Sequence, residues 1–72
     1  MKIEYDNESD AMFIWFHKGN HIKNEIIFSE IWPRELKEHI GFLFDEDGKI
    51  VGIEVLNASK YFRIDNLLDN LQ

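Results

Sequence analysis

The chain has 72 residues, of which 44% are hydrophobic and 14% aromatic, and its formal net charge at pH 7 is −6. The apolar fraction excludes a disordered segment, and the absence of cysteine excludes disulfides and thiolate zinc sites. This length predicts a single small domain over residues 1–72. Its core would be thin, so association with another chain would add useful stability.

Positive charge is sparse, because the eight lysines and arginines are scattered along the chain. Affinity for nucleic acid comes mostly from clustered cations, so we expect no direct nucleic-acid partner. The acidic balance favours a basic protein partner, although it also has the simpler role of keeping a small protein soluble. Apolar runs are far shorter than the roughly 20 residues that span a bilayer, and no signal peptide is evident. We expect a cytoplasmic bacterial or phage protein with no membrane partner.

Strand-like alternation dominates the first half of the chain. Residues 2–6 alternate between polar and apolar side chains and predict a first strand, followed by a polar turn at 7–10. Residues 11–17 predict a second strand, antiparallel to the first, that ends in a turn at 18–20. Residues 22–31 carry a weaker strand signal that stops near Pro33, and residues 34–40 predict about one helical turn.

The second half gives the clearest structural signal. Apolar runs on either side of residues 45–48 predict a β-hairpin over residues 41–56, with Gly48 in the left-handed region. Beyond it, helical spacing relates Ile64, Leu67, Leu68 and Leu71, and Asn57 or Ser59 is expected to cap this helix. We therefore predict an α+β fold, a small antiparallel sheet of about four strands with a short C-terminal helix.

Two segments resemble a known family: residues 5–14, YDNESDAMFI, and residues 45–59, DEDGKIVGIEVLNAS. They are similar to the small bacterial family known as domain of unknown function 2283, with its patterns YDxExDAlYI and DEDGrIVGIEIlDAS. The resemblance covers residues 1–60 and implies a compact sheet with a short helix, but no catalytic residues. Some members lie beside genes for small toxins, so it also suggests an antitoxin role.

This chain departs from the family pattern in two regions. Residues 28–40 include Trp32 and Pro33 in a stretch where typical members are shorter, and the tail over 62–72 is additional. Trp15 and Leu43 also stand where the family usually has polar residues. These departures indicate a surface adapted to a particular partner.

Sheet alternation divides the apolar residues between two faces. We expect one face to hold the core, with Met12, Ile14, Phe16, Phe42, Phe44, Val51, Ile53 and Val55. The opposite face would then be apolar without a clear cover, which usually marks an interface. The alternative is that residues 32–40 or the terminal helix fold over it. The candidate partner-binding residues are Phe13, Trp15, Leu43 and Ile50, with Glu4 and Asp6 as an acidic rim.

Two patterns resemble metal sites. Asp45 and Asp47 begin like a calcium loop, but Leu56 stands where the twelfth position needs glutamate. His17 and His21 are four apart, but they flank a turn and have no third ligand beyond the isolated His39. We predict no metal site and no cofactor.

Catalytic chemistry is also weakly supported. The acidic alternation of Glu4, Asp6, Glu8 and Asp10, with Glu54 as a further member, resembles paired carboxylates. A domain of this size lacks the enclosed pocket that such chemistry uses, so a solvated face or an acidic rim is the simpler interpretation. The serines at 9, 29 and 59 lie in no glycine elbow. We predict that the protein is not an enzyme.

The leading functional hypothesis is a non-catalytic protein-binding module, the antitoxin or immunity partner of a basic toxin. In it, acidic residues steer the encounter, and Phe13 and Trp15 supply the buried contacts. A second hypothesis is a structural or regulatory homodimer without a toxin. A third is an acidic inhibitor that imitates nucleic acid.

Overall fold

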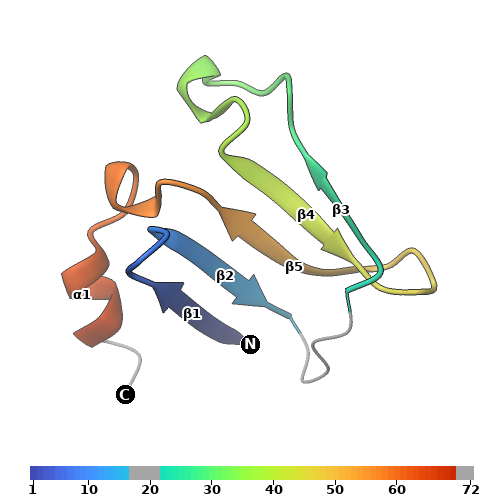
Figure 1. Cartoon of the computed structure of the whole chain (residues 1–72), viewed down its shortest axis with the longest axis horizontal. Helices are drawn as coiled ribbons and strands as arrows, with labels where there is room; N and C mark the ends of the chain where they lie inside the picture. Colours follow the sequence, from blue (N-terminus) through green and yellow to red (C-terminus); the bar gives the residue numbers. More distant parts are fainter. Residues whose placement is uncertain (17–21, 70–72) are drawn as a thin grey trace.

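The computed structural model describes residues 1–16 and 22–69, which form one antiparallel sheet and three short helical segments (Figure 1). The strands are β1 (Lys2–Asp6), β2 (Ala11–Trp15), β3 (Asn24–Ile27), β4 (Ile40–Phe44) and β5 (Ile50–Val55). The helical segments are the 3-10 turns η1 (Arg34–Leu36) and η2 (Ala58–Lys60) and the helix α1 (Ile64–Asp69). The strand order is β1-β2-β5-β4-β3, so β5 is central and the edges are β1 and β3.

The predicted antiparallel sheet with a short C-terminal helix is confirmed, but it has five strands rather than about four. The weak strand signal does form β3, because its backbone pairs with β4 from Asn24 opposite Phe44 to Ile27 opposite Gly41. Since the described helical segments are short, the fold is mostly sheet, and α+β describes it only approximately. The predicted turn at 18–20 and the last predicted helical residue, Leu71, lie outside the described residues.

The β4–β5 turn is organised by Asp45. Its carboxylate oxygen Oδ1 accepts hydrogen bonds from the backbone N–H groups of Asp47 and Lys49, at 2.9 and 3.0 Å. The Gly48 N–H donates to the Asp45 carbonyl at 3.1 Å, and Gly48 has a φ of 75°. The predicted left-handed conformation of Gly48 is therefore confirmed. The Asp45 side chain, which resembled a calcium ligand in the sequence, stabilises the turn.

Strand register separates the side chains into two faces, because cross-strand partners point to the same side of a sheet. One of them, the neutral face, has no charged residue at any strand position. Its residues are Ile3, Tyr5, Met12, Ile14, Asn24, Ile26, Ile40, Phe42, Phe44, Ile50, Ile53 and Val55.

One end of the neutral face holds the main core. Met12 and Val55 are buried there with Ala58 of η2, and the C-terminal segment closes over them with Tyr61, Ile64 and Leu67. Burial of a side chain such as Met12 contributes roughly 1.5–3 kcal/mol to stability. In Figure 1, α1 lies at the β1–β2 side of the sheet, away from β3 and β4. The C-terminal segment therefore covers only part of the neutral face.

A β-bulge in β5 changes the predicted phase of one strand. Leu43 pairs with Gly52 and Phe44 pairs with Ile50, so Val51 is an extra residue with no partner in β4. Val51 packs with Trp15 and Leu43 in a second cluster, on the face opposite the main core. The prediction that put Val51 in the main core and Ile50 on the opposite face is wrong, because the bulge interrupts the alternation.

Two further expectations need correction, and the structure also bears on the alternative that residues 32–40 cover a face of the sheet. Phe16 does not join the core, since 46% of its surface is exposed. Neither expected residue caps α1: Asn57 precedes η2 and makes no side-chain cap hydrogen bond, and Ser59 lies within η2. The loop that carries η1 projects beyond the ends of β3 and β4 (Figure 1). Trp32 lies in this loop and is 82% exposed. Trp32 therefore does not cover the sheet.

Candidate functional site

The two family-like segments meet at Asp10. Its carboxylate accepts a hydrogen bond from the Tyr5 hydroxyl at 2.6 Å, and from the N–H and hydroxyl of Ser59 at 3.0 and 2.7 Å. Its carbonyl accepts the N–H of Ala58 at 2.8 Å. The hydrogen bonds from Tyr5 and Ser59 lower the pKa of Asp10, so this carboxylate stays ionised. These residues tie the β1–β2 turn to η2, which is a structural role.

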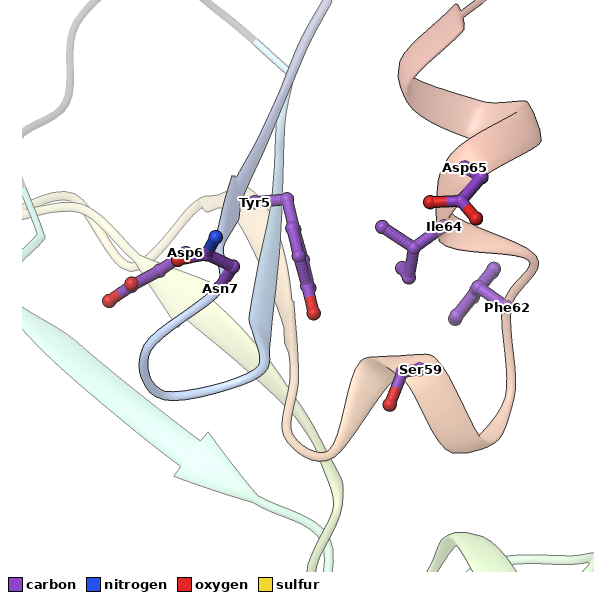
Figure 2. Close-up of a pocket in the computed structure, with 7 residues that line it drawn as sticks. All are labelled: Tyr5, Asp6, Asn7, Ser59, Phe62, Ile64 and Asp65. Carbon is purple, nitrogen blue, oxygen red and sulfur yellow. The ribbon is translucent and has the colours of Figure 1, made fainter.

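Beside this link lies a hollow of about 780 Å³ between the β1–β2 turn and the C-terminal segment (Figure 2). Its lining combines aromatic or aliphatic residues with two acids and no basic residue: Tyr5, Asp6, Asn7, Ser59, Phe62, Ile64 and Asp65. In Figure 2 the Asp65 carboxylate lies beside the hollow, whereas the Asp6 carboxylate points away from it. Hydrogen bonds from Ser9 and Glu8 lower the pKa of Asp6 and keep it charged. Because Asp65 lies beside the hollow and no basic residue lines it, the hollow suits a cationic group with an aliphatic stem better than an anion.

The face opposite the neutral face carries the charge of the sheet, and we call it the acidic face. Its strand positions include one cation, Lys2, and the four acids Glu4, Asp6, Glu25 and Glu54. Phe13 lies between Glu4 and Glu54 in the register. Lys2 and Glu4 approach to 3.5 Å, so part of this negative charge is compensated locally. The acidic face thus combines a half-buried aromatic ring with excess negative charge.

Glu54 and Glu25 form a carboxyl pair on the acidic face. They come from β5 and β3, which β4 separates, and Gly41 of β4 places no side chain beside Glu54. Burial raises the pKa of Glu54 to about 7, and a hydrogen bond and charge repulsion from Glu25 add to this rise. Near neutral pH the pair therefore holds a proton part of the time, and a cation placed there would displace it.

The structure brings five of the six predicted partner-binding residues to the acidic face: Glu4, Asp6, Phe13, Trp15 and Leu43. Their accessibility differs. Trp15 and Leu43 are only 6% and 1% exposed, so they offer little surface to a partner, whereas Phe13 is half-buried and stacks on Trp15 at 5.7 Å. The sixth, Ile50, lies on the neutral face and is 45% exposed.

Sequence reasoning missed the Glu25–Glu54 pair and the exposed residue Ile26. The pair depends on strand order, which alternation does not reveal. Trp32 stands out in the sequence as a departure from the family pattern, and it is 82% exposed. No group of three or more metal-binding side chains occurs among residues 1–16 and 22–69. His17 and His21, the histidines considered as ligands, lie outside that region. No described helix is long and apolar enough to cross a membrane.

Comparison with known proteins places these residues in a family. Residues 2–59 match the family described as protein of unknown function DUF2283. The chain is also 38% identical over 73 aligned residues to the uncharacterized protein MJ0789 of Methanocaldococcus jannaschii, an alignment that covers 99% of this chain and 54% of that relative. This chain thus spans about half the length of the curated relative, which is archaeal, so the family is not confined to bacteria. No solved structure matches the chain. The chain therefore belongs to the DUF2283 family.

Proposed function

We propose that this domain is a non-catalytic protein-binding module whose acidic face receives a basic protein. The observation that carries the proposal is the separation of charge between the two faces of one sheet. Strand positions on the neutral face have no charge, whereas the acidic face has Glu4, Asp6, Glu25 and Glu54 against Lys2. If the acidic residues served only solubility, we would expect some of them at the partly exposed end of the neutral face as well.

The acidic face offers both parts of a protein interface. Its carboxylates would attract a basic partner and orient it, and Phe13 supplies half-buried aromatic surface for the contact itself. Asp6 is a lining residue of the hollow, and its carboxylate points away from the hollow (Figure 2), so the hollow borders the acidic face. A lysine or arginine of the partner could enter the hollow while its neighbours meet Glu4.

A basic toxin is one partner of this kind, and an antitoxin role would require that binding suppress the toxin's activity. A nucleic-acid mimic would use the same carboxylates. Competition separates the two ideas: a partner that binds through a nucleic-acid groove would be displaced by DNA or RNA, whereas a toxin bound elsewhere on its surface would not.

The test begins with affinity capture from the source organism and then uses the purified partner in titration calorimetry. Glu4→Gln with Glu25→Gln should weaken binding about tenfold or more, and added salt should weaken the wild-type complex further. Glu30→Gln with Glu46→Gln is the matched control, because it removes the same charge from exposed residues outside the acidic face. Equal affinity of both double variants, or a partner without a basic surface, would refute the proposal.

A further inference from the structure

The uncovered end of the neutral face forms a continuous apolar patch, which we call the open patch: Ile26, Phe42, Phe44 and Ile50. Ile26 pairs with Phe42 across β3 and β4, and Ile50 pairs with Phe44 across β5 and β4. The rings of Phe42 and Phe44 meet edge to face at 6.5 Å, and Phe28 meets Phe42 in the same way at 4.9 Å. Four residues from three neighbouring strands therefore make one surface.

This surface is accessible in the single chain. Ile26 and Ile50 are 50% and 45% exposed, and Phe42 and Phe44 are only partly buried. The residues that cover the main core, Tyr61, Ile64 and Leu67, contact the other end of the neutral face. Contiguous apolar surface of this kind on a small protein usually marks an interaction site.

The distribution of charge over the two faces indicates which molecule binds the open patch. A basic partner would be drawn to the acidic face, because the strand positions around the open patch offer it no carboxylate. Two copies of this chain, each with a net charge of −6, repel one another wherever their acidic surfaces meet. Among the strand positions of the sheet, those of the neutral face are the ones at which two copies can meet without opposing like charges.

We propose that the open patch binds a second copy of this chain. The two sheets pack face to face about a two-fold axis, about 10 Å apart, so that each copy presents the same four residues to the other. Burying the patch also gives a 72-residue chain the extra apolar core that domains of this size need. Both acidic faces then point outward, so this inference does not depend on the partner proposed above.

Sedimentation equilibrium over a concentration series tests the proposal. The wild type should be a dimer, and Ile26→Glu should raise the dimer dissociation constant by about 100-fold or more, since each copy would bury an unpaired carboxylate. Phe62→Glu is the matched control: Phe62 is 39% exposed but lies at the hollow, so the same charge added there should leave the dimer intact. Circular dichroism checks that each variant is folded.

A second variant is needed because Ile26→Glu could unfold β3, which is an edge strand. Ile50→Ser removes apolar surface without adding charge, and it too should weaken the dimer if the patch is the interface. A wild type that stays monomeric overturns the proposal, as does a dimer that survives both Ile26→Glu and Ile50→Ser or that Phe62→Glu also dissociates.

Discussion

The carboxylate of Asp10 holds Ser59, a residue 49 positions away, through both the backbone N–H and the side-chain hydroxyl, at 3.0 and 2.7 Å. Asp10 also has a φ of 54°, which asparagine and aspartate tolerate better than most residues. The two family-like segments are thus joined at a single carboxylate, and the stability of the domain should depend on it.

Asp10→Asn should lower the thermal unfolding midpoint by several degrees, because asparagine keeps the backbone conformation but has one side-chain acceptor oxygen in place of two. Asp65→Asn removes the same charge from the edge of the hollow and serves as the control. Differential scanning calorimetry gives both midpoints. Equal midpoints for wild type and Asp10→Asn would show that the link to Ser59 is not stabilising.

Gly48→Val should destabilise the domain by about 1 kcal/mol or more, because Gly48 has a φ of 75° that a β-branched residue adopts poorly. A Cβ at this position would meet nothing within 4 Å, so the cost comes from the backbone and not from crowding. Gly48→Asn, which tolerates the left-handed region, should lose less. Urea denaturation measures the difference, and a larger loss for asparagine than for valine would contradict this explanation.

The Glu25–Glu54 pair predicts a specific pH dependence of stability. The pKa of Glu54 rises from 4.5 to about 7 in the folded protein, so the folded state binds more protons between these values than the unfolded chain does. The protonated Glu54 therefore makes its full contribution to the free energy of unfolding below about pH 4.5, and this contribution is lost as the pH rises to about 7. Glu54→Gln keeps a neutral side chain at every pH and should flatten this part of the stability profile. Urea titrations from pH 5 to 8 would reveal it, and an unchanged slope would exclude the pair as its source.

The two tryptophans should respond to solvent in opposite ways. Trp15 is 6% exposed and Trp32 is 82% exposed. In Trp32→Phe, the emission maximum of Trp15 should be shifted to the blue, and acrylamide should quench it weakly. In Trp15→Phe, the emission maximum of Trp32 should be shifted to the red, and acrylamide should quench it readily. A strongly quenched Trp15 would mean that its face of the sheet is open.

Much of the fold could be predicted because its signals are local. The hairpin over residues 41–56 follows from alternation on either side of Gly48, and alternation in β2 correctly puts Met12 and Phe13 on opposite faces. The bulge at Val51 could not be predicted, because alternation assigns every second residue to one face and gives no sign that a residue is inserted. The Glu25–Glu54 pair was equally hidden, since it needs β4 between the two strands and a glycine at position 41.

Strand order also determines when the domain can fold during synthesis. β5 is made after the other four strands of the described sheet, yet it lies between β2 and β4 and pairs with both. Until residue 55 has left the ribosome, β1–β2 and β3–β4 are two separate pairs of strands, and isolated two-stranded units are marginally stable in water. The nascent chain therefore gains most of its structure in one late, cooperative step, when β5 inserts between the two pairs.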